Sequence, residues 1–562
     1  MAAIAEQHLP EPPGTSEHHP ADPAALLVAS GLAAGLAGCG GGAADGSIPI
    51  NPVPVTPTRQ QASRFLSQAG LGSGAADIDQ VRQLGYAGWL DAQFALPRSS
   101  GYVDWLRSKG YDNPDNRNSF AGSNNMLWRK LIGSPDVLRQ RMTLALTEIV
   151  VVSLNGLANL GFRSFSAAAY MDIVEAQAFG NFRTLLEQVS TSTAMGSYLT
   201  FRGNRKAQNG AVPDENYARE LMQLFTIGLL ELDIDGTPRR VNGQPVETYT
   251  QDDVSQLARV FTGWDQDTSV GTNDTPDRSI RPMVQVAGRH ETSSKTFLGV
   301  NIPANTSAAD SLRIALDTLV AHPNVGPFVG RQLIQRLVTG NPSPAYVARV
   351  AKVFNDNGSG VKGDLKAVLR TILLDDEARS DRTLADPGFG KLREPLVRFL
   401  QWARTFGVTS PDDSWNIGDL SDPATRLGQS PLRSPTVFNF FRPGYVPPNS
   451  PLGDQSITAP EFQITTETSV AGYINFMQRT VSSNIGGLSG NYTGWLPLTA
   501  NSQSLLDELN IVLAAGQIPA ATLATLKTAL DTIAITSPAG QNNRLYAALT
   551  MVLAAPEYIT QK

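Results

Sequence analysis

The sequence has one cysteine, Cys39, and five histidines among its 562 residues. A single cysteine cannot form an intramolecular disulfide, and it leaves no Cys-based zinc or redox motif. Charged residues are also few, at 17%, and the net charge of −6 comes without a long run of lysine and arginine. Nucleic-acid binding needs clustered positive charge to displace counterions from phosphates, so this composition argues against a nucleic-acid-binding protein.

The N-terminal region has the pattern of an export signal. The apolar run AALLVASGLAAGLAG (24–38) is too short to cross a bilayer but suits the hydrophobic part of a secretory signal peptide. Its end, LAGC, resembles the lipobox of bacterial lipoproteins, in which the cysteine carries the lipid. We therefore expect a signal-like leader over 1–38, lipid attachment at Cys39, and a flexible Gly/Ala/Pro tether over 39–58.

This interpretation predicts an exported protein of the cell envelope, lipid-anchored in the outer membrane or secreted. Its membrane contact would be through the lipid alone. One feature departs from the pattern, because no lysine or arginine precedes Arg59, whereas signal peptides begin with positive charge. A misplaced start codon or an atypical leader would account for this. The alternative is a disordered tail with an incidental cysteine.

Residues 59–562 predict a mainly α fold, a large multi-helix body. Apolar side chains recur at helical spacing along most of this region, with glycines such as Gly85 as breaks. One long helix is predicted through SPDVLRQRMTLALTEIVVVSL (134–154). The best strand signals are MVQVAG and KTFLGV, which predict a small β-hairpin insertion near residues 280–300.

The stretch from Pro213 to Trp264 contains the densest set of polar groups. It predicts two amphipathic helices, PDENYARELMQLFTIGL and YTQDDVSQLARVFTGW, with Thr250 and Asp253 forming a capping box at the start of the second. Together with a nearby His-Glu pair, these helices define one candidate polar network or metal site. Its residues are Glu215, Asn216, Arg219, Glu220, Asp252, Arg259, His290 and Glu291.

Two interpretations of this set remain open. In the structural one, Arg219 and Arg259 pair with carboxylates across the two helices in a buried network. In the functional one, the carboxylates hold a divalent cation: oxygen ligands suit Ca²⁺, Mg²⁺ or Mn²⁺, and an added imidazole favours Zn²⁺ or Fe²⁺. The sequence has no HExxH zinc motif, GxSxG elbow, P-loop or Rossmann fingerprint, so no motif names a reaction.

The Pro-rich segment QSPLRSPTVFNFFRPGYVPP (429–448) predicts a loop rather than a helix. Its aromatic side chains could bind a sugar or a peptide, or could anchor the loop by burial in the body. The candidate ligand-binding residues of this loop are Arg433, Phe438, Phe440, Phe441, Arg442 and Tyr445.

Several stretches, in this order, resemble the bacterial family called domain of unknown function 1800, over roughly residues 59 to 562. They are SRFLSQAGLG, LGYAGWLDAQF, ENYARELMQLFTIG, YTQDDVSQLARVFTGW, KTFLG, RQLIQRLVTGNPSPAYV, GDLKAVLRTILLD, REPLVRF and QSPLRSPTVFNFFRPGY. The resemblance implies a helical, exported bacterial protein without an established activity. Relatives are often encoded beside an exported protein that resembles phosphatases and sulfatases, which makes such a protein a candidate partner.

The chain departs from this family at two places. Many relatives carry a WHNHF-like segment where this chain has LALTEIV, and a His-Asp pair where it has His290 and Glu291. The first departure removes candidate metal ligands. We therefore expect a lipid-anchored binding or assembly partner of another exported protein. The alternative is a metal-dependent hydrolase with a carboxylate-lined site between the two central helices.

Overall fold

The structure, a computed structural model, describes residues 56–562. The predicted leader, Cys39 and nearly all of the tether therefore lie outside the described residues. The first helix, α1 (Arg59–Ala69), starts at a capping box in which Thr58 and Gln61 bond each other's backbone N–H groups. The predicted break at Gly85 is a kink inside α2 (Ala75–Ala95), where Gly85 has a φ of 68°.

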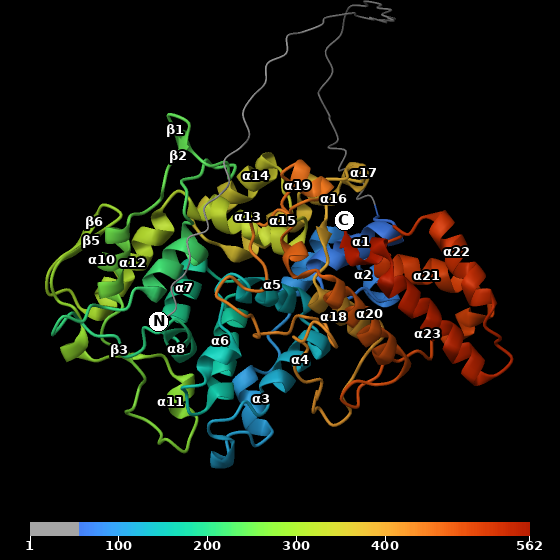
Figure 1. The fold of residues 1–562 in the computed structure, drawn as a ribbon, viewed down its shortest axis with the longest axis horizontal. Helices are drawn as coiled ribbons and strands as arrows, with labels where there is room; N and C mark the ends of the chain where they lie inside the picture. The colour runs from blue at the N-terminus through green and yellow to red at the C-terminus, as the bar shows by residue number, and fades with distance from the viewer. Residues whose placement is uncertain (1–55) are drawn as a thin grey trace, which may run out of the picture. The chain divides into compact units, whose positions relative to one another are not determined.

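Helices form most of the described chain, which confirms the mainly α prediction (Figure 1). Up to residue 260 the further α-helices are α3 (Tyr102–Ser108), α4 (Ser123–Gly133), α5 (Val137–Thr147), α6 (Arg163–Ala176), α7 (Phe182–Thr191), α8 (Thr193–Tyr198), α9 (Asn216–Glu220) and α10 (Gln251–Val260). The later α-helices are α11 (Asp277–Ile280), α12 (Ala308–Ala321), α13 (Val325–Leu337), α14 (Pro344–Asn355), α15 (Leu365–Leu374), α16 (Asp376–Arg379), α17 (Arg382–Ala385), α18 (Pro395–Thr405), α19 (Pro451–Asp454), α20 (Glu467–Ser482), α21 (Ser502–Ala514), α22 (Ala520–Asp531), α23 (Pro538–Ala554) and α24 (Pro556–Ile559). The short helical turns are η1 (Pro114–Asn116), η2 (Leu154–Leu157), η4 (Ala287–Arg289), η5 (Pro460–Ile464), η6 (Leu496–Ala500) and the π-helical η3 (Leu221–Thr226).

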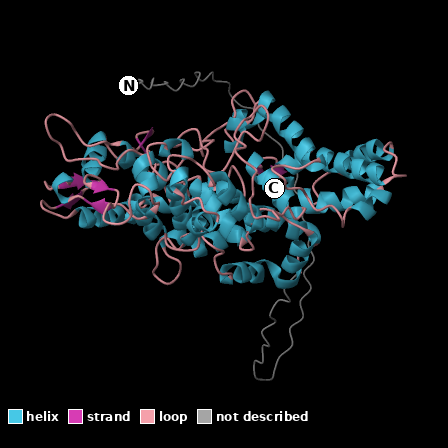
Figure 2. Ribbon diagram, turned by 90° about the horizontal axis from the view of Figure 1, so that it is seen from below, coloured by secondary structure: helices cyan, strands magenta, loops and turns pink. Residues whose placement is uncertain are grey.

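The strands form small antiparallel pairs among the helices (Figure 2). They are β1 (Arg240–Val241) with β2 (Gln244–Pro245), β3 (Trp264–Asp265) with β4 (Val284–Gln285), β5 (Lys295–Phe297) with β6 (Val300–Ile302), and β7 (Lys391–Leu392) with β8 (Thr560–Gln561). The run KTFLGV does form a hairpin. The run MVQVAG does not pair with it but with β3, because the hairpin turn at Leu298 and Gly299 already supplies KTFLGV with its partner.

The helix predicted over 134–154 is shorter than its apolar pattern indicated. It ends at Thr147, and Glu148 is its C-terminal cap residue. The next four residues, 149–152, are buried and outside the helix. They are Ile-Val-Val-Val, and side chains branched at Cβ have a lowered helix propensity because they lose χ1 freedom in a helix. This early end determines where the Glu148 carboxyl lies.

Chain segments far apart in sequence meet in the body, and residues 56–562 belong to one compact unit. The C-terminal helices α21, α22 and α23 pack on one another, and α21 also packs on α1, as the adjoining red and blue ribbons of Figure 1 show. Strand β8 at the C-terminus pairs with β7. Among the residues that the structure describes, no helix has both the length and the apolar composition needed to cross a membrane.

Candidate functional site

The two central helices pack against each other as amphipathic helices. Helix α9 continues directly into the π-helical turn η3, a wide turn that is frequent at functional sites. Tyr217, a residue of α9, is buried, and its ring stacks on the ring of Phe201 with 4.3 Å between the ring centroids. Helix α10 starts at the predicted capping box: Thr250 Oγ1 accepts from Asp253 N at 3.3 Å, and Asp253 Oδ2 accepts from Thr250 N at 2.8 Å. Asp253 is therefore engaged in helix capping.

One polar group of the predicted network forms around Glu215. Its carboxylate accepts from Arg219 Nη2 at 3.2 Å, from Gln251 Nε2 at 2.8 Å and from Ser255 Oγ at 2.5 Å. Gln251 and Ser255 belong to α10, so these bonds tie the start of α9 to α10. Asn216 lies beside this group and donates from Nδ2 to Thr200 Oγ1 at 3.4 Å.

A second polar group forms around Arg259, and its acidic partner comes from a loop rather than from the other central helix. Arg259 Nη1 donates to Gln256 Oε1 at 2.6 Å, Nη2 donates to Ser293, and Nη2 lies 4.0 Å from Glu291 Oε1. Buried His290 lies next to them, and its Nδ1 is 2.8 Å from the carbonyl of Thr262. Burial lowers the pKa of His290, so the neutral ring is favoured.

Two predicted residues lie outside both groups. Asp252 is exposed and accepts only a long bond from Gln256 Nε2, at 3.5 Å. Glu220 is 8% exposed and its Oε2 has no hydrogen-bond partner in the described chain. Burial raises the pKa of Glu220 to about 7, against the lowering effect of Arg219. Within residues 56–562, no three His, Cys, Asp or Glu side chains converge as metal ligands.

The aromatic loop is partly buried and partly open. Phe441 is buried under Arg336, whose guanidinium carbon lies 4.6 Å from the ring centroid. Phe440 is half-buried, Tyr445 is half-buried, and Arg433 pairs with Asp419 at 3.2 Å. By contrast, Phe438 and Arg442 stack on each other at 4.5 Å beside an open cleft. The loop is thus anchored through Phe441, while Phe438 and Arg442 line the cleft; the ligand-binding role of the loop stays a prediction.

This cleft, which we call the arginine cleft, has a volume of about 500 Å³ and lies between η3, α13 and the loop segment 437–444. Its walls are mostly apolar, with Leu224, Leu229 and Phe328 among them. Gly228 has a φ of 73°, and a Cβ there would lie 2.6 Å from the Phe328 ring. Only glycine therefore lets the chain turn this close to the wall.

Polar groups on α13 face the arginine cleft without being fully paired. Arg331 is half-buried, burial lowers its pKa, and among the described residues no acceptor or carboxylate lies within bonding distance of its guanidinium. Gln332, which is 6% exposed, has an Nε2 without a partner in the same part of the chain. A buried donor without an acceptor costs free energy, and this applies to Gln332 Nε2. Arg331 is a half-buried cation at the same cleft.

The floor of the cleft is a cluster of buried charges. Glu148 Oε2 lies 3.2 Å from Arg336 Nε, and behind it Glu394 lies 3.5 Å from Lys391 Nζ. Burial, then the charge of Glu394, raises the pKa of Glu148 well above its usual value. Burial works in the same direction on Glu394, but Lys391 and the hydrogen bond with Glu148 hold the pKa of Glu394 below its usual value. Because the two carboxyls lie side by side, the proton that one of them binds affects the other, and they titrate as a pair.

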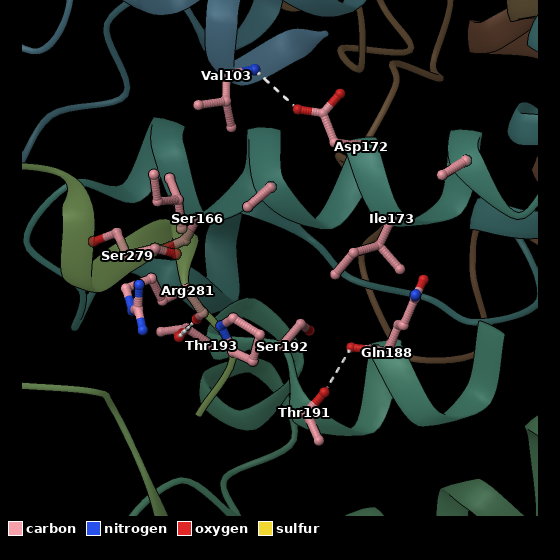
Figure 3. A pocket seen from close by; sticks show the side chains of 14 residues that line it. Val103, Ser166, Asp172, Ile173, Gln188, Thr191, Ser192, Thr193, Ser279 and Arg281 are labelled. Atoms are coloured by element: carbon pink, nitrogen blue, oxygen red, sulfur yellow. Dashed lines mark hydrogen bonds between the residues drawn. The ribbon is translucent and has the colours of Figure 1, made fainter. Parts of the chain in front are cut away.

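A further pocket, of about 440 Å³, lies between α6, α7 and the segment before β4 (Figure 3). Its polar groups are already paired within the protein. Asp172 accepts from Val103 N at 3.1 Å, Thr191 Oγ1 donates to the Gln188 carbonyl at 3.3 Å, and Thr193 Oγ1 donates to the Arg281 carbonyl at 3.1 Å. This pocket therefore offers a ligand fewer free groups than the arginine cleft does.

Glu148, Arg331, Gln332 and Arg336 are not among the site residues predicted from the sequence. A signal was present for three of them. Arg331 and Gln335, and likewise Gln332 and Arg336, are four residues apart, which makes a polar stripe on an otherwise apolar helix. Nothing local distinguished Glu148, since its position depends on where α5 ends.

The fold is that of a mainly α-helical protein with an open, arginine-containing cleft. A family model described as "Protein of unknown function (DUF1800)" matches residues 64–560, and the chain belongs to this family. The comparisons with curated proteins and with solved structures gave no match.

Proposed function

We propose that this protein is a binding or assembly partner of another exported protein at the cell envelope, held there by a lipid on Cys39. The arginine cleft is the surface that engages the partner. The observation that carries the proposal is the buried Gln332 Nε2, which has no acceptor among residues 56–562, beside the half-buried guanidinium of Arg331 in a cleft with apolar walls. Such a cleft combines the apolar area that drives association with polar groups that orient the bound segment.

The partner we propose is a co-exported protein that resembles phosphatases and sulfatases. Arg331 and Arg442 give the cleft a positive lining, since Arg336 is paired with Glu148, and this favours an acidic partner segment. The metal-dependent hydrolase remains the second candidate, and the observation that favours it is the buried carboxyl of Glu220, whose Oε2 has no hydrogen-bond partner among residues 56–562. Stoichiometric metal in the purified chain, lost in Glu220→Ala, would favour the hydrolase.

The experiment uses affinity-tagged full-length protein in bacterial cells, with quantitative mass spectrometry of co-purified envelope proteins. The variant is Arg331→Glu, which reverses the unpaired charge in the cleft. We expect it to reduce recovery of the phosphatase/sulfatase-like protein by about tenfold or more, because like charges then face each other. The matched control is Arg313→Glu on α12, where the side chain is 58% exposed.

A parallel variant, Cys39→Ser, tests the anchor. We expect it to move the protein from the membrane fraction to the soluble fraction while partner recovery from that fraction persists. Equal partner recovery with Arg331→Glu and wild-type protein would contradict a role for the cleft. Unchanged membrane association of Cys39→Ser would contradict lipid anchoring.

A further inference from the structure

A second cleft adjoins the arginine cleft. This second cleft, which we call the acidic cleft, has a volume of about 780 Å³ and shares Gly236, Pro238 and Arg331 with the first as lining residues. Arg331 therefore stands at the junction of two binding surfaces. A ligand that passes the Arg331 guanidinium has a surface to contact on both sides.

The two clefts differ in charge. Asp235, Glu377 and Asp386 line the acidic cleft. Asp235 and Asp386 have no cationic partner within 4.0 Å among residues 56–562, while Glu377 lies 3.8 Å from Arg349 Nη2. Their carboxylates do bond nearby backbone N–H groups: Asp235 accepts from Thr237 N at 2.9 Å and Asp386 from Gly388 N at 2.8 Å. These bonds fix the two carboxylates in place but do not neutralise their charge.

From these observations we infer that the two clefts bind one extended polypeptide segment with apolar, acidic and basic residues in that spatial order. Apolar side chains fill the arginine cleft against Leu224, Leu229 and Phe328. A carboxylate binds the guanidinium of Arg331, and basic side chains extend over Asp235 and Asp386. This inference rests on the proposed function, since it specifies the chemistry of the partner segment.

A polypeptide fits this surface better than an acyl chain with a carboxylate head. An acyl chain would satisfy the apolar walls and Arg331, but it would leave the acidic cleft without a complement. A carboxylate held by arginine gains a charge-assisted, directional bond, and the same group placed beside Asp235 or Asp386 would be repelled. The charge pattern therefore also determines the orientation of the bound segment.

The experiment is a selection of random dodecapeptides, displayed on phage, against the purified full-length protein. We expect each enriched peptide to contain a group of apolar residues, then an Asp or Glu, then a Lys or Arg, or the same three in the reverse order along the chain. Both chain directions are acceptable, because the clefts set a spatial order only. Synthetic copies of the enriched peptides should bind Arg331→Met at least about tenfold more weakly than wild type, since the carboxylate loses its partner.

A second variant tests the other end of the segment. In Asp235→Asn with Asp386→Asn, the amide oxygens can still accept from Thr237 N and Gly388 N, so the local structure is kept. We expect the enriched peptides to bind this double variant more weakly, and binding to become less sensitive to salt. Thermal unfolding of each variant shows whether the fold is intact.

Three outcomes would overturn the inference: no peptide enriched above the Arg331→Met background, enriched peptides without an acidic residue, or equal binding to wild type and both variants. Binding of decanoate at Arg331 without any peptide enrichment would indicate a lipid ligand instead. The selection uses this protein alone, so it can fail while the envelope partner still co-purifies, and the reverse also holds. Failure of this inference is thus distinguishable from failure of the proposed function.

Discussion

Glu220 has a carboxyl group whose environment works against its charge. It is 8% exposed, Oε2 has no partner in the described chain, and burial raises its pKa to about 7 from 4.5. When the pH is below the pKa of Glu220 in the unfolded chain, this carboxyl is protonated in both the folded and the unfolded state, so it does not affect stability there. As the pH rises toward 7 the unfolded chain releases its proton first, and the folded state becomes less stable.

Replacing Glu220 by Gln should therefore stabilise the protein at neutral and higher pH only. We expect Glu220→Gln to raise the free energy of unfolding by about 1–3 kcal/mol at about pH 8 and to leave it nearly unchanged at about pH 4. Urea unfolding at the two pH values measures this difference. Glu215→Gln is the control, because Glu215 already accepts from Arg219, Gln251 and Ser255 and should lose stability instead. A pH-independent effect of Glu220→Gln would contradict the assignment.

At the scale of elements, one buried side chain holds the wall of the arginine cleft. The segment 229–247, which carries β1 and β2, follows η3 and supplies Leu229, Leu230 and Leu232 to that wall. Asn324, at the start of α13, donates from Nδ2 to the carbonyls of Ile227 at 2.9 Å and Leu230 at 2.7 Å. It also accepts at Oδ1 from Leu232 N at 2.9 Å. The same amide thus closes the segment onto α13.

Asn324→Ala should loosen this wall. The substitution leaves two carbonyls and one N–H without partners, and each unsatisfied buried group costs about 1–3 kcal/mol. We expect hydrogen exchange in residues 229–247 to accelerate by about tenfold or more, measured by mass spectrometry. The control is Asn510→Ala, which removes the amide that bonds Ile518 and should affect only the turn after α21. Unchanged exchange over 229–247 would show that other contacts hold the wall.

At the scale of the whole molecule, the buried charges behind the cleft join distant parts of the chain. Lys391 on β7 lies 2.9 Å from Glu461 Oε1 and donates to the carbonyl of Arg336 at 2.8 Å. Lys391 and Glu461 are each about 1% exposed as side chains. Removing one partner of such a pair strands a buried charge, whereas replacing both with apolar groups can be nearly neutral.

Lys391→Met should accordingly lower the free energy of unfolding by about 3–5 kcal/mol. The double variant with Glu461→Leu should recover part of that loss, since the nearer of the two stranded carboxylates is then gone while Glu394 remains. Urea unfolding of the single and double variants measures both effects. Lys527→Met, at an exposed ion pair with Asp531, is the control and should change stability by about 1 kcal/mol or less. A double variant as unstable as the sum of the single variants would contradict the coupling.

The sequence by itself determined what depends on neighbouring residues. Helical spacing of apolar side chains established the mainly α fold, and the caps at Thr58 and Thr250 lie where local pattern sets the start of a helix. The pairing of Glu215 with Arg219, four residues apart, belongs to the same class. In each case the interacting groups are close along the chain, so their spacing in the sequence is sufficient to predict the interaction.

Only the tertiary structure decided which distant groups share a site. Gln335 on α13 and Pro443 in the aromatic loop are 108 residues apart, yet Gln335 Nε2 donates to the Pro443 carbonyl at 2.9 Å beside the arginine cleft. Glu148 reaches the cleft floor because α5 ends at Thr147. Within residues 56–562, Arg331 has no ion-pair partner because of where the carboxylates of other elements come to lie. Periodicity carries no information about such convergence, because it depends on how whole elements pack.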